Sequence, residues 1–345
     1  MPLEIVVDAM GSDQAPESEI RGSIAACRKL DVRVVLVGPE DLVRPALDTA
    51  LAGERLPIDV LHASEWISMD DKAASVIRSK PNSSMRVGLK RVREGTAAGF
   101  FTAGNTGAAM ATAKMVLGML PGVDRPALAA VLPTTAGPSL LLDVGANVDS
   151  DPENLIQFAL MGNIYAREVM AVARPRVGLL SIGEEDSKGN AQTRETLPLL
   201  REEALLHFIG NVEGRDLFNG HADVIVCDGF VGNVALKASE GLARLVRDSL
   251  KESLRSTVSS TIGALLSQSA FRNWKRRLDY TEYGGAPLLG VRGACIIGHG
   301  SSDANAILNG IRVTAEFAGA RVNDSIATAI QTRRNTLAQP AATQS

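Results

Sequence analysis

Six times along this chain, a short apolar run typical of a buried strand ends in a loop rich in Gly, Asn, Asp, Ser or His, and a helical pattern usually follows. These loops lie at 9–13, 104–107, 143–147, 183–185, 228–233 and 298–302. Strands that alternate with helices form a parallel sheet. The loops after such strands gather along one edge, where ligands bind. The pattern therefore predicts an α/β fold with a polar crevice. The exception is a turn at 134–138, which predicts an antiparallel hairpin between 128–132 and 139–142.

Several residues in these loops are suited to holding a small anion. Glycine lets the backbone approach a ligand, and helix N-termini offer free N–H groups and a positive dipole end. The Gly-Asn-Thr-Gly loop at 104–107 fits either an anion cradle or a helix cap with a tight turn, and its recurrence after several strands favours the cradle. The candidates are Asn105, Thr106, Gly107, Asn147, Gly232, Asn233, Ser301 and Ser302.

Three ionisable side chains lie in or near these loops. His299 occupies a Gly-His-Gly-Ser-Ser loop where no core needs filling, so we interpret it as a proton carrier. Lys188 follows an acidic run, and a solvated loop charge is the alternative interpretation. Lys237 lies one turn into a helix, where it points either at the anion or at solvent.

Composition excludes several other classes of protein. A net charge of −3 and a pI near 5.9 argue against a nucleic-acid partner. Neither a Walker A motif nor a dinucleotide fingerprint after the first strand is present, and no His, Cys and carboxylate grouping has metal-ligand spacing, so we predict no metal. The chain begins a strand at once, has no apolar run of membrane-spanning length, and carries three cysteines that fit a reducing compartment. We therefore expect a cytoplasmic protein.

Residues 256–280 have a different character from the rest. Apolar residues such as Ile262 and Leu266 are followed by a cluster of cations at 272–277. Three interpretations remain open: packing within a dimer or subdomain, an amphipathic element on a membrane surface, or a basic dock for an acidic protein.

Taken in order, the loops and their flanks resemble the phosphate acyltransferase family, the PlsX-type enzymes of bacterial phospholipid synthesis. The matching strings include VDAMG at 7–11, SSMR at 83–86, AGNTGA at 103–108, LDVGAN at 142–147, IGEE at 182–185, IGNVEGRD at 209–216, CDGFVGN at 227–233, EYGGAPLLG at 282–290 and IGHGSS at 297–302. The similarity covers roughly residues 3–320. Ser12 stands where the family usually has a second Gly, and Asp71-Lys72 where it often has a Pro.

The resemblance implies a three-layer α/β/α fold with a mostly parallel sheet, similar to isocitrate dehydrogenase and phosphotransacetylase. It implies a homodimer that moves a fatty acyl group from acyl-acyl carrier protein to inorganic phosphate without a cofactor. The acyl phosphate product then passes to a membrane glycerol-phosphate acyltransferase. The implied catalytic residues are Lys188, His299 and Asn233, and the implied phosphate- or substrate-binding set gains Asp8, Gly11, Asp228 and Lys237. The implied contacts to the acidic carrier protein or to an anionic membrane are Ile262, Leu266, Arg272, Lys275, Arg276 and Arg277.

We expect one catalytic unit over 1–335, with a protruding helical subregion at 234–285 and a disordered tail at 336–345. Peripheral association with the inner face of the membrane is part of this expectation. Two competing functions stay open: a phosphotransacetylase-like enzyme that uses coenzyme A, and a non-enzymatic membrane scaffold, against which the retained polar loops argue.

Overall fold

In a computed structural model, which describes residues 2–271 and 284–338, one sheet of 11 strands runs through the described chain. The strand order is β3-β2-β1-β4-β11-β10-β5-β6-β9-β7-β8. The strands are β1 (Leu3–Asp8), β2 (Val32–Gly38), β3 (Ile58–His62), β4 (Gly99–Thr102), β5 (Ala127–Thr134), β6 (Gly137–Leu142), β7 (Arg176–Leu180), β8 (His207–Val212), β9 (Val224–Val226), β10 (Ala286–Leu289) and β11 (Ala294–Ile297).

The sheet consists of two parallel halves that point in opposite directions. β3, β2, β1, β4 and β11 form one half, and β6, β9, β7 and β8 form the other. Between them, β10 and β5 pair antiparallel with their neighbours. Ile297, which ends β11, pairs with Ala286, and Leu142, which ends β6, pairs with Ala129. The C-terminal ends of both halves therefore meet across β10 and β5.

This arrangement confirms the predicted mostly parallel sheet and the 128–142 hairpin, but it corrects one detail. The polar loops do not gather along one edge of a uniformly parallel sheet. They approach the junction from two opposed half-sheets, because β10 and β5 reverse the strand direction. Loops after β11 and β6 and after their neighbours β4 and β9 can face each other, whereas the loops after β1 and β7 lie farther from the junction.

Helices cover both faces of the sheet and give three layers. Side chains alternate along β1, so Ile5 and Val7 face one helical layer while Val6 faces the other. One layer contains α1 (Glu17–Lys29), α2 (Glu40–Leu51), α6 (Pro152–Glu168), α7 (Ala191–Arg201), α11 (Ala304–Gly319) and α12 (Val322–Ala338). The other contains α3 (Ala73–Ser79), α4 (Ser84–Arg93), α5 (Thr106–Leu117), the 3-10 turn η1 (Gly214–Leu217) and the start of α8 (Gly229–Arg255).

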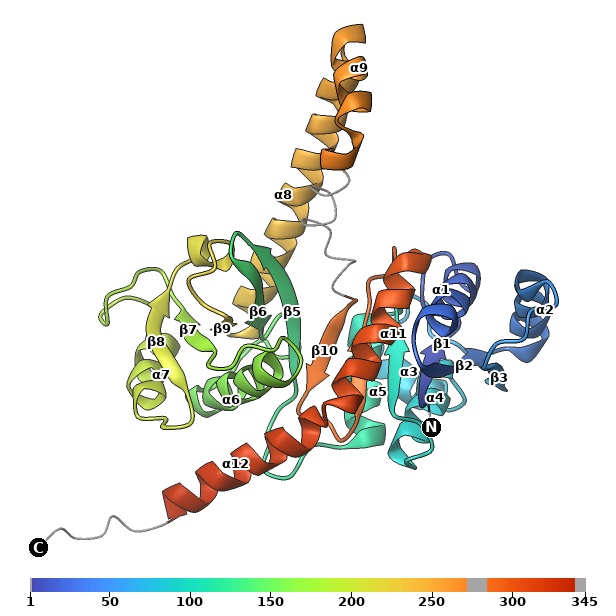
Figure 1. Cartoon of the computed structure of the whole chain (residues 1–345). Coiled ribbons are helices and arrows are strands. Elements are labelled where there is room, and N and C mark those ends of the chain that lie inside the picture. The colour runs from blue at the N-terminus through green and yellow to red at the C-terminus, as the bar shows by residue number, and fades with distance from the viewer. Residues whose placement is uncertain (1, 272–283, 339–345) are drawn as a thin grey trace, which may run out of the picture.

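The long helix α8 projects away from the sheet, and α9 (Val258–Leu266) packs beside it (Figure 1). The buried residues of α8 are Gly229 and Gly232, both in its first turn. Large apolar side chains farther along are exposed, among them Leu245 on α8 and Leu266 on α9, with exposed fractions of 66 % and 83 %. No helix in the described ranges is both long and apolar enough to cross a membrane.

Three elements were missed from the sequence: α7, β10 and α12. α12 packs on α6, and Arg333 pairs there with Glu153 and with Glu203, the latter at 2.7 Å. The tail predicted from residue 336 begins inside α12, which runs to Ala338. Leu and Ala are strong helix formers, so the helix continues to that point. Residues 339–345 lie outside the described part.

Candidate functional site

A cavity of about 460 Å³ opens where the two half-sheets meet, between α5, α8 and α11. Its wall comprises Thr106, Gly107, Met110, Leu128, Ala130, Val131, Leu132, Val144, Gly145, Asn233, Leu236, Lys237, Glu240, Gly284, Gly285, Ala286, Ile297, Gly298, His299, Ser302 and Ala306. These residues come from the end of β11, the loops after β6 and β11, the start of β10, β5, and the helices α5, α8 and α11. The junction between the half-sheets thus brings segments distant in sequence together into a single site.

The polar side of the cavity is built from helix starts. α5 begins at Thr106, and α11 begins at Ala304, just after the wall residue Ser302. The second and third turns of α8 contribute Asn233 and Lys237. Helix starts present unsatisfied N–H groups and the positive end of a dipole, so this side suits an anion.

Charge on the wall comes from a single pair of residues, as far as the described chain shows. Lys237 Nζ lies 2.9 Å from Glu240 Oε2, one turn away on α8. The Lys237 side chain is 56 % exposed, so the pair contributes little to stability. Lys237 is therefore a cation that an incoming anion can share with Glu240.

The ring of His299 is oriented by its own loop. The backbone N–H of Ser301 donates to Nδ1 at 3.2 Å, and the Ser301 hydroxyl lies 2.9 Å from the same nitrogen. Because Nδ1 accepts a backbone proton, we assign the ring proton to Nε2. Ser301 thus fixes the orientation of the imidazole ring, and Nε2 is the nitrogen that carries the N–H donor.

Another part of the cavity wall, a side formed around β5, is apolar. Leu128, Ala130 and Leu132 occupy alternate positions of β5 and so share one face of the sheet. Met110, one turn into α5, and Leu236 on α8 complete this side. A wall that combines helix starts with aliphatic side chains fits a ligand with a charged head and a hydrocarbon chain.

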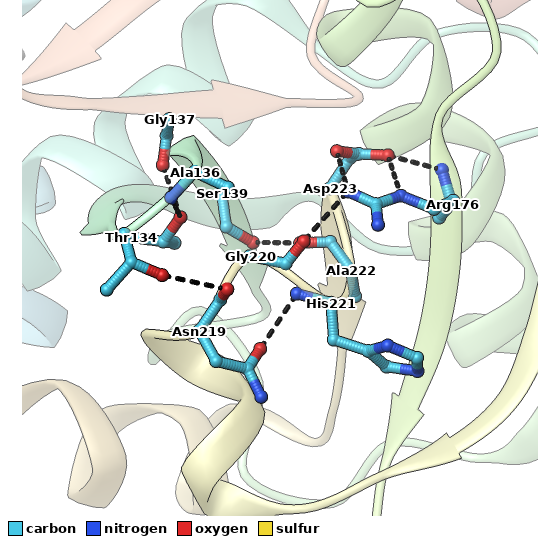
Figure 2. Close-up of polar contacts among 11 residues, drawn as sticks. Thr134, Ala136, Gly137, Ser139, Arg176, Asn219, Gly220, His221, Ala222 and Asp223 are labelled. Carbon is cyan, nitrogen blue, oxygen red and sulfur yellow. Dashed lines mark hydrogen bonds and ion pairs between the residues drawn. The ribbon is translucent and has the colours of Figure 1, made fainter.

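Polar contacts outside the cavity hold the β5–β6 hairpin in place (Figure 2). The Ser139 hydroxyl donates to the Ala222 carbonyl at 3.0 Å, and Thr135 Oγ1 donates to the Asn219 carbonyl at 3.0 Å. Next to them, Arg176 Nε donates to Asp223 Oδ2 at 2.9 Å. The hairpin that supplies the apolar wall is therefore tied to the loop before β9.

Asp143, which the sequence prediction missed, fixes the loop after β6. Its carboxylate accepts hydrogen bonds from the backbone N–H groups of Leu128, Gly145, Ala146 and Asn147 and from the Asn147 amide, at 2.7–3.1 Å. Burial raises the pKa of this carboxyl. The matched string at 142–147 contains Asp143. The sequence does not show whether an aspartate is buried or exposed, so its role in holding the loop was missed.

The same loop receives the start of α8. A Cβ atom on Gly232 would lie 1.9 Å from the Asp143 carbonyl oxygen, and one on Gly229 would lie 2.1 Å from the Asn147 carbonyl oxygen. Only glycine permits this approach. It brings Asn233 beside Gly145, where both line the cavity.

Six of the predicted site residues line the cavity: Thr106, Gly107, Asn233, Lys237, His299 and Ser302. Three other predicted side chains are committed to the backbone. Asn105 caps α5 through Ala108 N–H and donates to two carbonyls at 68–72; Asn147 donates to the Pro126 carbonyl at 2.7 Å. Asp228 caps α8 and accepts from Ser150 N–H at 2.9 Å.

Asp8 ends β1 and Gly11 follows it, one strand beyond β4, and both lie outside the wall. Asp8 accepts from Thr102 Oγ1 at 2.8 Å, and burial raises the pKa of Asp8. A Cβ on Gly11 would lie 2.9 Å from Gly104 N, so this glycine lets the loops after β1 and β4 pack together. Below this loop, Ser12 N–H donates to the buried Glu19 at 2.7 Å, and burial raises the pKa of Glu19 to about 7.

Lys188 is exposed on the loop between β7 and α7, and it is not part of the cavity wall. β7 is two strands away from β6, which explains the separation. Ile262 and Leu266 are exposed on α9. Arg272, Lys275, Arg276 and Arg277 lie outside the described residues. Within the described ranges, no group of three His, Cys, Asp or Glu residues is arranged to hold a metal ion.

Comparison with known proteins places this geometry in context. Residues 3–325 match the family described as fatty acid synthesis protein. The phosphate acyltransferase of Acidobacterium capsulatum is 67 % identical, with 94 % of this chain and 96 % of that protein covered. The phosphate acyltransferase of Koribacter versatilis is 62 % identical, with coverages of 95 % and 92 %. Among solved structures, a phosphotransacetylase from Streptococcus pyogenes has a TM-score of 0.61 at 18 % identity, covering 92 % of this chain and 94 % of its own, which shows a shared fold.

Proposed function

This chain belongs to the phosphate acyltransferase family of fatty acid synthesis, and from that premise we propose that it moves a fatty acyl group from acyl-acyl carrier protein to inorganic phosphate. The product is an acyl phosphate for phospholipid synthesis. The observation that carries the proposal is the mixed wall of the cavity, in which helix starts and aliphatic side chains line the same space.

Phosphate binds on the polar side of the cavity, next to the helix starts. The starts of α5 and α11 direct N–H groups at it, with Thr106 and Ser302 adding hydroxyl donors. Lys237 supplies the positive charge, and Asn233 supplies an amide donor. Lys188 is the second candidate for the cation, and it reaches the site only if its loop moves. The acyl chain lies along Leu128, Ala130 and Leu132.

The chemistry is an acyl transfer in which positioning does most of the work. A phosphate oxygen attacks the thioester carbonyl carbon and forms a C–O bond and a tetrahedral oxyanion. Asn233 and the Nε2–H of His299 stabilise that oxyanion. The C–S bond then breaks, the carbonyl re-forms, and the leaving thiolate takes up the proton carried in by hydrogen phosphate. No redox step is involved.

The exposed apolar residues of α8 and α9 support two proposals about partners. A homodimer would cover Leu242 and Leu245 on α8, which are 59 % and 66 % exposed. Contact of the α9 tip with an anionic membrane would deliver the acyl phosphate to a membrane glycerol-phosphate acyltransferase. Replacing Ile262 and Leu266 by Glu should abolish flotation with anionic liposomes while leaving turnover intact. Loss of the dimer or of the fold in that variant would make the segment structural.

The function is tested by incubating the protein with acyl-acyl carrier protein and phosphate. Formation of acyl phosphate, together with free carrier thiol, is expected. A matched reaction with the coenzyme A thioester identifies the donor: preference for coenzyme A would replace our proposal with a phosphotransacetylase-like activity. Absence of turnover with both donors would favour the scaffold.

A further inference from the structure

The segment from Lys72 to Leu117 is strongly basic. It contains eight Lys and Arg residues and one acidic residue, Glu94, whereas the whole chain has a net charge of −3. This imbalance lies in α3, α4 and α5, which form part of the layer next to β1 and β4. Such a local excess of positive charge attracts negatively charged partners.

The cations lie on the outer surface of this layer. On α4, Met85, Leu89 and Val92 are buried against the sheet. Arg86, Lys90 and Arg93 follow each other at spacings of four and three residues, which places them on one face of the helix. The exposed side chains of Lys72, Arg78 and Lys114 extend this face over α3 and α5. We define these six residues as the basic face.

Most of this charge is not neutralised within the described chain. Lys90 approaches Glu94 at 3.7 Å, and two cations outside the basic face, Lys80 and Arg91, pair with Asp71 and Glu4 at 2.5 Å each. The other five members of the basic face form no ion pair with any described residue: Lys72, Arg78, Arg86, Arg93 and Lys114. A surface of unpaired cations attracts an acidic partner over a distance of about 10 Å at moderate ionic strength.

The basic face begins at the rim of the cavity. α5 starts at Thr106 and Gly107, which line the wall, and a Cβ on Gly107 would lie 3.3 Å from Ala73, the first residue of α3. The Asn105 side chain donates to the carbonyl oxygens of Met69 and Asp71 at 3.0 Å and so ties the approach to α3 to the same loop. A protein bound here would therefore stand beside the opening of the cavity.

We propose that the basic face docks the acidic carrier protein that delivers the acyl thioester. The proposal rests on the proposed function and adds the place where the donor binds. A membrane surface fits less well, because the outward face of α4 carries cations and no apolar residue for insertion. On α5, Met115 beside Lys114 is one exposed apolar residue, whereas four of them, Val258, Ile262, Leu265 and Leu266, group on α9.

The test is a triple charge reversal, Lys90→Glu, Arg93→Glu and Lys114→Glu, which avoids the half-buried Arg86. We expect the KM for acyl-acyl carrier protein to rise at least about tenfold, while kcat, the KM for phosphate and turnover of a coenzyme A thioester stay unchanged. The matched control reverses three exposed cations elsewhere, Lys29, Arg55 and Arg174, and should leave the carrier KM unchanged. The neutral triple variant to Gln should give a smaller rise in the same direction.

Salt supplies a second readout. The carrier KM of the unsubstituted protein should rise with ionic strength, and that dependence should be weaker in the triple reversal. An unchanged carrier KM in the triple reversal would overturn the proposal, as would loss of liposome flotation in that variant with no change in carrier KM. Failure of the proposed function is a different result, since then the unsubstituted protein would turn over no acyl-acyl carrier protein.

Discussion

Lys237 and Glu240 face each other at 2.9 Å on the wall of the cavity, with the starts of α5 and α11 on the same wall. In our proposal, this is the charge that a phosphate entering the cavity meets. Lys188, the other lysine that the sequence suggested, is exposed on the loop after β7 and outside that wall.

The two lysines therefore make a matched pair. Lys237→Met should raise the phosphate KM by roughly tenfold or more, because a charge-assisted hydrogen bond to the anion is lost. Lys188→Met should leave the phosphate KM unchanged. Steady-state kinetics with varied phosphate measures both, and the reverse pattern would move the cation to the β7 loop.

His299 is expected to act as a hydrogen-bond donor. His299→Ala should lower kcat about a hundredfold, since one donor to the oxyanion disappears. His299→Gln keeps an N–H donor on a side chain of similar reach and should recover part of that loss. If Gln is no better than Ala, the ring does more than donate, and proton transfer by the imidazole becomes the better account.

The fold was largely predictable because its strands are apolar runs ended by glycine-rich loops. The reversal of strand direction at β10 and β5 was not. β10 is short, with only Ala286 to Leu289, and its antiparallel pairing is decided by neighbours far away in sequence. α12 was missed although Val322, Ile326 and Ile330 recur every four residues, a helical spacing; they are few among polar residues, and the helix packs on α6.

Loop polarity was enough to predict some of the residues that line the cavity. It was not enough where burial or a backbone partner determines whether a polar side chain reaches the cavity. Thr106, Asn233 and Ser302 follow strands next to the junction and reach the cavity. Asn105 and Asn147 look the same in sequence, but their amides are taken by backbone groups. Neither these partners nor the depth of a side chain can be read from loop composition, because both depend on which distant segments pack against each residue.

The apolar wall should limit the length of the acyl chain. Ala130 lies on β5 between Leu128 and Leu132, so Ala130→Leu narrows the cavity without removing a polar contact. We expect kcat/KM to fall for long acyl thioesters and to stay nearly unchanged for short ones, with Ala130→Val intermediate. Thermal unfolding is the control for overpacking, which typically lowers stability by about 1–3 kcal/mol. An equal loss at every chain length would place the hydrocarbon elsewhere.

Glu19 should make stability depend on pH. Burial raises its pKa from the ordinary 4.5 to about 7, with a further contribution from the nearby Asp8. The folded protein then keeps a proton that the unfolded chain releases, so stability declines as pH rises from about 4.5 to 7. Glu19→Gln should remove up to ~3 kcal/mol of that decline and be the more stable protein at pH 8.

Chemical denaturation at several pH values measures this effect. Glu17→Gln is the control, because its side chain is 67 % exposed on the same helix and should leave the slope unchanged. A Glu19→Gln variant with the slope of the unsubstituted protein would mean that other groups set the dependence.

α8 is one uninterrupted rod from the cavity to its outer end. Gly232 packs directly against the backbone of Asp143. Asn233 and Lys237 lie within the next five residues, and the helix continues to Arg255. The 23 residues beyond Gly232 span ~35 Å, so a tilt of about 5° at Gly232 displaces the far end by ~3 Å. Motion of the far end of α8 and the orientation of Asn233 and Lys237 at the cavity are therefore coupled. A partner that holds the far end in place would also fix the angle at which these two side chains face a bound ligand.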